Sequence, residues 1–347
     1  MSELTAVCAS LKNHAPSRDY NPSQPSRCWR EHDVLNNKIV DAYVMILRTK
    51  GCSWARSSGC TMCGYWNDSM GHEVTDHDLL QQFQHAMQCY AGEKIVKIFT
   101  SGSFFDEHEI PPMVRNHVFE TLSHSAEKIN VESRPQYVTL KTVAPLEKVL
   151  SKQQLQVGMG LETSNDFIRT YAVNKGFSFN EYKKAALLLR DHEFLVKTYV
   201  LVKPPFLTEH EAVQDCLQTI KDSTVYSDTI SLNPTNVQRH TLVEYLWKRH
   251  QYRPPWLWSI VDILKQGKKH TTTRLQCDVS GGGNPRGPHN CSVCDQKILQ
   301  AITDFSLHQK PKVFDNLRCD CHEQWLDQLD GEALTYGSCV DFSRWSE

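Results

Sequence analysis

The sequence lacks any long apolar run. None of its apolar segments approaches the roughly 18 residues that a membrane-spanning helix needs. Its first residues, Met1 to Thr5, also lack the basic start and apolar core of an export signal. We therefore expect a cytoplasmic protein with no membrane partner.

A strong net charge is also missing. Lysine and arginine together number 38, and aspartate and glutamate 40, which gives a formal charge of −2. This balance argues against a positive coat over the whole surface, so an anionic partner has to be bound by a local patch. Cysteine, by contrast, is plentiful, with 13 residues in a chain of 347. In a reducing compartment, clustered thiols are more often metal ligands than disulfides.

The first cysteine group follows directly on an apolar run, residues 42–47, that is typical of a strand. Its spacing is Cys52-x7-Cys60-x2-Cys63. Three thiolates can hold an iron–sulfur cluster that ordinarily takes four, and one iron then stays open for a ligand that is not protein. We therefore predict a catalytic cluster on Cys52, Cys60 and Cys63.

Short apolar runs alternate with amphipathic stretches along the middle of the chain. Six strands are predicted, at 42–47, 95–99, 128–131, 156–161, 195–202 and 229–232. Helices are predicted between them, notably at 76–90, 180–191 and 209–221, with Thr75, Ser178 or Asn180, and Thr208 as caps. This alternation is typical of a parallel sheet, and six units are too few for a closed barrel of eight. The expected fold class is therefore α/β, a partial (β/α)6 barrel.

Three regions are expected along the chain. Residues 1–35 are polar and rich in turn-forming residues, which predicts an extended N-terminal arm. Residues 36–270 make the partial barrel. Residues 271–347 follow a flexible Gly-Pro stretch and form a separate, small, Cys-rich region that a metal holds together.

Polar residues stand at the end of each predicted strand. In a parallel barrel, these positions converge on one partly desolvated cavity where catalytic residues gather. The segments are Thr100-Ser101-Gly102-Ser103, Glu132-Ser133-Arg134, Gly160-Leu161-Glu162, Lys203-Pro204-Pro205 and Asn233-Pro234-Thr235. Ion pairs that close the rim of the barrel are the alternative for any single residue.

Together these motifs resemble the radical S-adenosylmethionine (SAM) superfamily, and within it the Elongator-like branch and its archaeosine-forming family, RaSEA. The resemblance runs from about Asp41 to at least Cys321, through the cysteines, the strand-end segments, Arg253-Pro-Pro-Trp-Leu-Trp258 and Gly287-Pro-His-Asn-Cys291. It implies a 4Fe–4S cluster on the three cysteines, with SAM bound at the open iron. One departure is the seven-residue gap after Cys52, where the commonest superfamily motif has three.

The resemblance also implies roles for individual residues in SAM binding. Ser101, Gly102 and Ser103 would contact the methionine amino group, and Glu132, Arg134 and Glu162 the ribose and the methionine carboxylate. Met62 or Tyr65 would pack on adenine, because Met62 replaces the usual aromatic residue before the last cysteine. Two alternatives stay open: Glu162 pairs with Arg134, and Lys203 either meets the substrate or closes a rim ion pair.

A second group of cysteines offers ligands for a zinc ion. The two short-spaced pairs are Cys291 with Cys294 and Cys319 with Cys321. Four cysteines make a closed, structural site because no position is left for a substrate. Cys277 is a possible substitute for one of them, and an auxiliary iron–sulfur cluster is the competing assignment.

A basic segment between Lys248 and Arg274 stands out from the balanced chain. It has one acid, Asp262, and seven basic residues: Lys248, Arg249, Arg253, Lys265, Lys268, Lys269 and Arg274. Tyr252, Trp256 and Trp258 lie among them, and exposed rings beside positive charges suit a phosphate backbone with unstacked bases. The alternative is a solvated helix and loop whose tryptophans face the core.

The family resemblance implies a tRNA substrate, with the tRNA or a partner contacting the C-terminal region. The reaction would cleave the carbon–nitrogen bond of a lysine adduct of 7-cyano-7-deazaguanine in the tRNA D-arm, a lyase reaction that gives archaeosine. ArcS, which attaches that lysine, would be the protein partner, and no electron donor is identified. Two alternatives remain: a radical SAM enzyme that modifies a different tRNA base, and a non-catalytic zinc-dependent nucleic-acid-binding protein.

Overall fold

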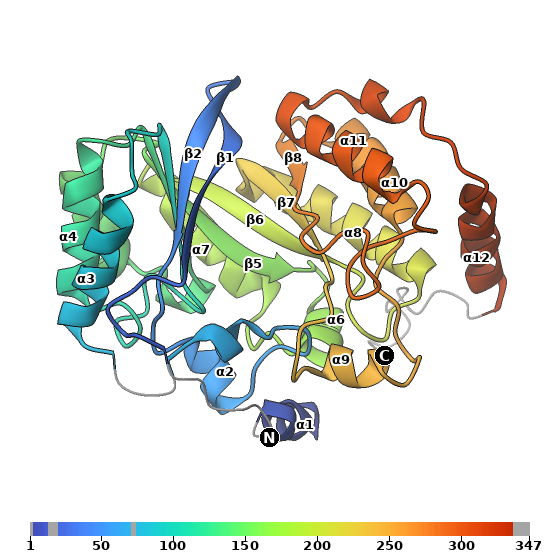
Figure 1. The fold of residues 1–347 in the computed structure, drawn as a ribbon, viewed down its shortest axis with the longest axis horizontal. Coiled ribbons are helices and arrows are strands. Elements are labelled where there is room, and N and C mark those ends of the chain that lie inside the picture. Colours follow the sequence, from blue (N-terminus) through green and yellow to red (C-terminus); the bar gives the residue numbers. More distant parts are fainter. Residues whose placement is uncertain (1–2, 13–19, 71–73, 336–347) are drawn as a thin grey trace. The chain divides into compact units, whose positions relative to one another are not determined.

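The computed structural model describes residues 3–12, 20–70 and 74–335. In these residues, eight strands are ordered in one sheet from β1 to β8, so that neighbours in the sheet are neighbours in the chain (Figure 1). The strands are β1 Arg27–Leu35, β2 Lys38–Ile46, β3 Ile95–Phe99, β4 Lys128–Glu132, β5 Leu155–Glu162, β6 Leu195–Val202, β7 Thr229–Pro234 and β8 Arg274–Cys277.

The pairing of the strands sets where their ends lie. Strand β1 is antiparallel to β2, whereas β2, β3, β4 and β5 pair in parallel, with Tyr43 opposite Val96 in the β2–β3 register. Strands β7 and β8 are also parallel. Because parallel strands share one direction, the segments that follow β2, β3 and β4 lie at one edge of the sheet. That edge is where the three cysteines and the Ser-Gly-Ser segment are found.

The expected α/β class with six successive βα units is confirmed, and the six predicted strands correspond to β2 through β7. The N-terminal region differs from the expected extended arm, because it contains helix α1 (Glu3–Lys12) and strand β1. Strand β1 was not predicted because it contains several charged residues, which are unusual in a strand. They are satisfied by tertiary ion pairs: the ammonium of Lys97 lies 2.5 Å from a carboxylate oxygen of Asp33 and 2.7 Å from one of Glu31.

Helices follow most of the strands. The remaining α-helices are α2 Ser53–Ser57, α3 Asp76–Met87, α4 Pro112–Ser123, α5 Leu140–Val143, α6 Asp166–Ile168, α7 Phe179–Asp191, α8 Glu209–Ser223, α9 Leu242–Trp247, α10 Leu257–His270, α11 Asp295–His308 and α12 Cys321–Thr335. Short 3-10 turns include η1 Tyr65–Asp68 and η2 Pro135–Tyr137, and Arg169–Val173 is π-helical. No helix in the described ranges combines the length and the apolar character of a membrane span.

The predicted caps of three helices are confirmed. The hydroxyl of Thr75 accepts a hydrogen bond from the backbone N–H of Asp78 at the start of α3. Ser178 and Thr208 do the same at the starts of α7 and α8, and each helix has a complete capping box. Such a cap satisfies N–H groups that have no partner inside the helix, which is why these boundaries can be predicted from local sequence.

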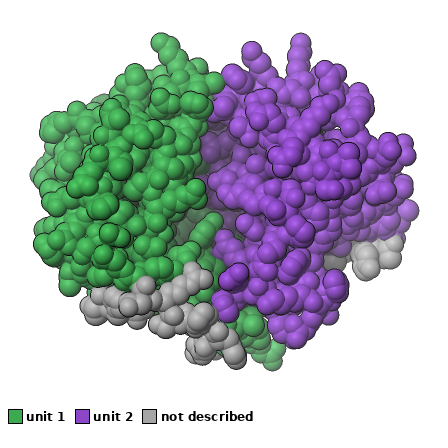
Figure 2. Space-filling view, in the orientation of Figure 1, with its two compact units in different colours: residues 1–160, 176–197 green, residues 161–175, 198–347 purple. Residues whose placement is uncertain are grey.

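The chain divides into two compact units (Figure 2). Unit 1 comprises residues 1–160 and 176–197, and unit 2 comprises 161–175 and 198–347. In unit 2, the Cys-rich region does not have a core of its own. Ile298, Phe305 and Trp325 from that region pack in one hydrophobic cluster with Ile220 of α8 and Ile263 of α10. The C-terminal region is thus built into the core of unit 2, not attached as the separate region expected.

Candidate active site and metal centre

The first three cysteines lie in the loop after β2, in unit 1. Cys52 stands at the N-terminus of α2, directly after Gly51, whose φ of +80° suits glycine. The backbone N–H of Cys63 donates to the carbonyl of Cys60 at 3.3 Å, which closes the turn between them. All three side chains are partly exposed thiols outside any disulfide. They are therefore accessible for binding a metal cluster.

Lys12 reaches this loop from helix α1. Its ammonium donates to the carbonyl of Ala55 at 2.5 Å and to the carbonyl of Ser58. Burial lowers the pKa of Lys12, whereas the nearby thiols, Cys60 and Cys63 among them, act to raise it. A lysine from the N-terminal segment is thus a neighbour of the cysteines, which the sequence did not reveal.

The Ser-Gly-Ser segment after β3 packs directly against the first cysteine. A Cβ atom placed on Gly102 would lie 2.7 Å from the Cα of Cys52 and 2.9 Å from its backbone nitrogen. Any side chain there would displace the cysteine loop, so the close approach requires glycine. Ser101 is partly exposed beside it, and Ser103 is buried.

Glu109 connects the two loops, and the sequence analysis missed it. One of its carboxylate oxygens accepts from the hydroxyl of Thr49 at 2.6 Å, and the other from the backbone N–H of Ser103 at 2.5 Å. Its side chain is fully enclosed, and this burial raises its pKa to about 7 although both hydrogen bonds act in the opposite direction. No local signal marks it, because Glu109 directly follows Asp106, Glu107 and His108, which together are typical of a polar loop.

Arg134 lies in the same neighbourhood. Its guanidinium stands 5.3 Å from the ring centres of both Trp54 and Phe177, and Trp54 belongs to α2 of the cysteine loop. Its backbone N–H donates to the hydroxyl of Ser103 at 3.1 Å. The structure thus brings together the first cysteine, the Ser-Gly-Ser segment and Arg134.

The other residues expected around SAM have more varied surroundings. Glu132, at the end of β4, is partly buried, and its carbonyl accepts from the backbone N–H of Phe104 at 2.8 Å. Met62 is partly buried in the cysteine loop, and Tyr65 is 61% exposed at the start of η1. In unit 2, the carboxylate of Glu162 pairs with the ammonium of Lys175 at 2.5 Å. The partner that the sequence analysis considered for it was Arg134.

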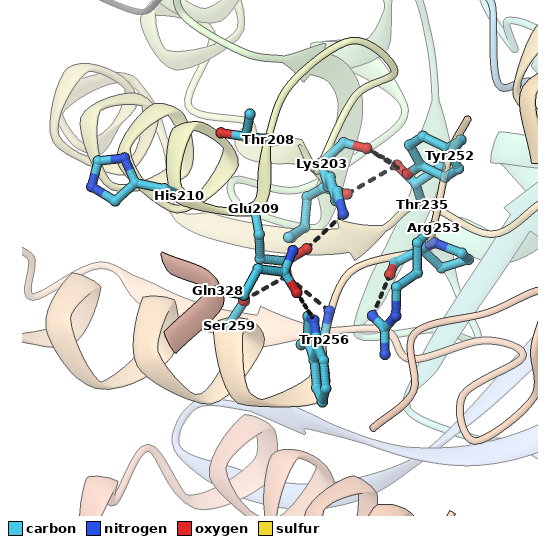
Figure 3. A network of polar contacts seen from close by, with 12 residues as sticks. Lys203, Thr208, Glu209, His210, Thr235, Tyr252, Arg253, Trp256, Ser259 and Gln328 are labelled. Carbon is cyan, nitrogen blue, oxygen red and sulfur yellow. Dashed lines mark hydrogen bonds and ion pairs between the residues drawn. The ribbon is translucent and has the colours of Figure 1, made fainter. Parts of the chain in front are cut away.

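Lys203 forms an ion pair, which is the second of its two expected roles (Figure 3). Its ammonium lies 2.7 Å from a carboxylate oxygen of Glu209, and both side chains are buried. The other oxygen of Glu209 accepts from the backbone N–H of Trp256 at 2.8 Å and from the hydroxyl of Ser259 at 2.6 Å. The carbonyl of Lys203 accepts from Tyr252 at 2.7 Å. The network joins α8 to the start of α10.

The second cysteine group converges as predicted from its spacing. The sulfur atoms of Cys291, Cys294, Cys319 and Cys321 all lie within 4.8 Å of one another. The Cys291–Cys319 and Cys294–Cys321 sulfur distances are both 3.6 Å, and Cys291–Cys294 is 3.9 Å. Tetrahedral zinc with Zn–S bonds of about 2.3 Å requires sulfur atoms about 3.8 Å apart. The four thiols therefore fit a single tetrahedral ion.

Nearby N–H groups support thiolates at this centre. The indole of Trp258 donates to the sulfur of Cys321 at 3.3 Å, and the amide of Asn290 donates to that of Cys294 at 3.4 Å. Desolvation raises the pKa of Cys294 to about 11 and also raises that of Cys321, although these donors act to lower both, whereas backbone N–H groups that include that of Cys294 lower the pKa of Cys291 to about 7. Donors to ligand sulfur orient and stabilise metal-bound thiolates. Cys277 lies outside this group, buried at the end of β8.

The basic segment is only partly available to an anionic partner. Lys268 donates to the carbonyls of Thr272 and Thr273, and Arg274 to that of Ser306. Lys265 lies 4.0 Å from Asp315. Lys248, Arg249 and Lys269 are exposed, although the ammonium of Lys248 also lies 3.4 Å from a carboxylate oxygen of Glu244.

The sequence left two interpretations of the aromatic residues in this segment open, an exposed stacking surface or rings that face the core, and the structure shows the second. Tyr252 and Trp258 are buried, and the indole of Trp256 donates to Gln328 at 2.9 Å. Tyr252 and Trp258 can face the core because their polar atoms form hydrogen bonds inside unit 2. The hydroxyl of Tyr252 donates to the carbonyl of Lys203, and the indole of Trp258 donates to the sulfur of Cys321.

A cavity of about 710 Å³ opens beside the exposed part of the basic segment. Trp247, Lys248, His250, Arg253 and His289 are among the residues that line it. Two carbonyls hold the guanidinium of Arg253, those of Pro254 and His289, both at 2.8 Å. The cavity wall is thus basic, and at Arg253 it is held firmly in place.

These features define the class of the protein: an α/β protein of successive βα units with a three-cysteine loop at the carboxyl edge and a cluster of four cysteines that fits a metal ion. No protein-family model matches the chain. Over 325 residues it is 40% identical to the archaeosine synthase subunit beta of Methanosarcina acetivorans, covering 92% of this chain and 93% of that protein. Over 305 residues it is 36% identical to the archaeosine synthase subunit beta of Thermococcus kodakarensis, covering 86% and 94%. The chain therefore belongs to the archaeosine synthase subunit beta family.

The solved structures that match the chain are more distant. Methylornithine synthase matches with a TM-score of 0.49 and 11% identity, covering 80% of this chain and 72% of that one. The archaeal Elp3 of Methanocaldococcus infernus matches with a TM-score of 0.47 and 13% identity, covering 70% and 59%.

Proposed function

We propose that this protein is a radical SAM enzyme that modifies tRNA in archaeosine synthesis. The observation that carries the proposal is the cysteine loop after β2, packed against Gly102 at the carboxyl edge of the sheet in a chain of the archaeosine synthase subunit beta family. Cys52, Cys60 and Cys63 would hold a 4Fe–4S cluster. When bound, such a cluster would bind SAM at its open iron and cleave it reductively, which supplies a 5'-deoxyadenosyl radical.

The residues around the loop position the cofactor. Gly102 lets the Ser-Gly-Ser segment approach Cys52, and Glu109 holds that segment through the N–H of Ser103. Ser101 would contact the methionine amino group, because the backbone N–H of Ser103 already donates to the carboxylate of Glu109. Arg134 offers a planar, charged fork for the methionine carboxylate, and Glu132 an acceptor for the ribose hydroxyls. Met62 or Tyr65, both in the cysteine loop of unit 1, would pack on adenine.

The substrate we propose is tRNA whose D-arm carries the lysine adduct of 7-cyano-7-deazaguanine. The radical would abstract a hydrogen atom from the lysine moiety and become 5'-deoxyadenosine, and cleavage of the carbon–nitrogen bond would release the lysine carbon skeleton and leave archaeosine on the tRNA. ArcS, which attaches the lysine, would supply this substrate and act as the protein partner. The name of the relatives, a synthase subunit beta, supports an assembly with another subunit.

The test uses reduced, anaerobically purified protein with SAM and lysine-modified tRNA. We expect the tRNA digest to contain archaeosine, and 5'-deoxyadenosine to form in step with it. Deoxyadenosine without archaeosine would point to a different tRNA base as the target. A colourless protein that contains zinc and no iron would instead support the non-catalytic nucleic-acid-binding alternative.

For the four-cysteine centre we propose a structural zinc ion. Three of the sulfur pairs are 3.6 to 3.9 Å apart and all four sulfur atoms lie within 4.8 Å of one another, which supports one ion, because thiolates on different irons of a cluster are held farther apart. Metal analysis should find one zinc per chain in addition to the iron of the cluster. The Cys319→Ser variant should lose the zinc, whereas Cys277→Ala should keep it. Two iron–sulfur clusters per chain and no zinc would support the auxiliary cluster.

For tRNA binding we propose the cavity beside the basic segment. Lys248 and Arg249 are exposed at or near its rim, and Arg253 and His289 lie in its wall. Positive charge around a cavity wide enough for a nucleotide suits a tRNA phosphate. Lys265, Lys268, Lys269 and Arg274 would add only a more distant attraction.

A further inference from the structure

Lys12 is the last residue of α1, and its side chain ends inside the cysteine loop of unit 1. The ammonium donates to the carbonyl of Ala55, within α2, and to that of Ser58, the residue that ends this helix. The last carbonyls of a helix have no partner within it and carry partial negative charge. Lys12 therefore caps the C-terminus of α2 from a distant part of the chain.

The loop is shaped to receive this side chain. Gly59 has a φ of +97°, and a Cβ atom placed on it would overlap the ammonium of Lys12 and lie 2.7 Å from its Cε. The ring of Trp66 has its centre 5.8 Å from the same ammonium. Gly59 directly precedes Cys60, and Trp66 follows Cys63 by three positions. The positive charge is thus enclosed by the segment that carries two of the three cysteines.

We propose that Lys12 is a positioning residue of the cluster: it fixes the loop between Cys52 and Cys60 and places one positive charge beside the iron. This inference rests on the proposed function, because it needs a cluster on these cysteines. A cluster with three thiolates is anionic and gains a further negative charge on reduction. A nearby cation stabilises the reduced form more than the oxidised form, which raises the reduction potential.

The experiment compares the full-length protein with three variants after anaerobic loading with iron and sulfide. Lys12→Met removes the charge and the hydrogen bonds, Lys12→Gln removes the charge but keeps a donor, and Lys12→Arg keeps both. Lys38→Met is the matched control, because Lys38 is an exposed lysine at the opposite end of β2 from the cysteine loop. Iron content is measured first, and the midpoint potential is then followed by the electron paramagnetic resonance signal of the reduced cluster.

We expect a more negative midpoint potential in Lys12→Met and Lys12→Gln, and a potential near that of the wild type in Lys12→Arg and Lys38→Met. Loss of the cluster from Lys12→Met but not from Lys12→Arg would also support the proposal. Wild-type potentials in all variants would overturn it. Loss of the cluster from both Lys12→Arg and Lys12→Met would also overturn the proposal, because a positive charge and a hydrogen-bond donor at position 12 would then make no difference to cluster binding. A wild-type protein that takes up no iron refutes the proposed function itself, so the two failures are distinguishable.

Discussion

Gly102 lies against Cys52 so closely that a Cβ atom on the glycine would stand 2.7 Å from the Cα of the cysteine. The contact joins the segment after β3 to the segment after β2. Two neighbouring strand ends are thereby held in register at the edge of the sheet where the cluster is proposed. The chemistry expected there depends on this packing as much as on the thiols.

The substitution Gly102→Ala should disrupt the cofactor site while the fold persists. The added methyl group overlaps the backbone of Cys52 and must push the two loops apart. We expect lower iron content after anaerobic loading and at least tenfold less 5'-deoxyadenosine per iron. The control is Gly331→Ala in α12, where a Cβ atom meets nothing within 4 Å. Unchanged deoxyadenosine formation in Gly102→Ala would show that the contact is dispensable.

Glu109 should make the stability of the protein depend on pH. Burial raises its pKa from 4.5 to about 7. Between these values the folded protein holds a proton that the unfolded chain has released, so the free energy of unfolding falls as the pH rises from 4.5 to 7. The fall amounts to ~3 kcal/mol at 1.36 kcal/mol per pKa unit.

Anaerobic urea unfolding across this pH range should show a smaller fall for Glu109→Gln, because glutamine does not titrate. Asp215, whose pKa burial also raises to about 7, is present in both proteins and cancels in the comparison. The same pH dependence in both proteins would mean that Glu109 does not titrate in this window.

Lys203 should prove to be a structural residue. Lys203→Met leaves the carboxylate of Glu209 buried without its cation, which should cost about 3–5 kcal/mol of the free energy of unfolding. The double variant Lys203→Met with Glu209→Gln should lose less than the sum of the two single losses, because the charges are removed together. Urea unfolding measures the free energy of unfolding of the wild type, of Lys203→Met, of Glu209→Gln and of the double variant. If Lys203→Met is as stable as the wild type but modifies tRNA poorly, the prediction is wrong and Lys203 binds the substrate instead.

Lys248 and Arg249 should contribute to tRNA binding through their charge. Replacing both by alanine should weaken binding and reduce the slope of log affinity against log salt by about 1 to 2, because each lost phosphate contact removes about 0.9. The control is Lys297→Ala, an exposed lysine of α11 outside the basic segment. Filter binding at several salt concentrations measures the slope. An unchanged slope in the double variant would exclude this face from contact with tRNA.

The local features of the chain could be predicted because they depend on neighbours in the sequence. Thr75, Ser178 and Thr208 cap their helices with residues three positions away. The two cysteine pairs, Cys291 with Cys294 and Cys319 with Cys321, also needed no more than short spacing to indicate one metal centre. Strand β1 was missed because the carboxylates of Glu31 and Asp33 are paired with Lys97, a residue of another strand.

The partners of the charged residues could not be predicted in the same way. Lys265 and Arg274 belong to a basic run in the sequence, yet in the structure they meet Asp315 and the carbonyl of Ser306. A buried charge takes whichever partner the fold brings within reach, and a linear pattern does not contain that distance. Glu109 could not be predicted for the same reason, because its two partners, Thr49 and Ser103, follow different strands.

The sequence by itself determined the six strands that correspond to β2 through β7, three helix caps and the convergence of the four C-terminal cysteines, because periodicity, capping and thiol spacing act over a few residues. Only the tertiary structure decided which side chains surround those cysteines. Lys12 and the carbonyl of Ser58 are 46 residues apart in the chain and meet only because α1 packs beside the loop. Contacts of this kind depend on how distant segments pack, and packing is a property of the whole fold.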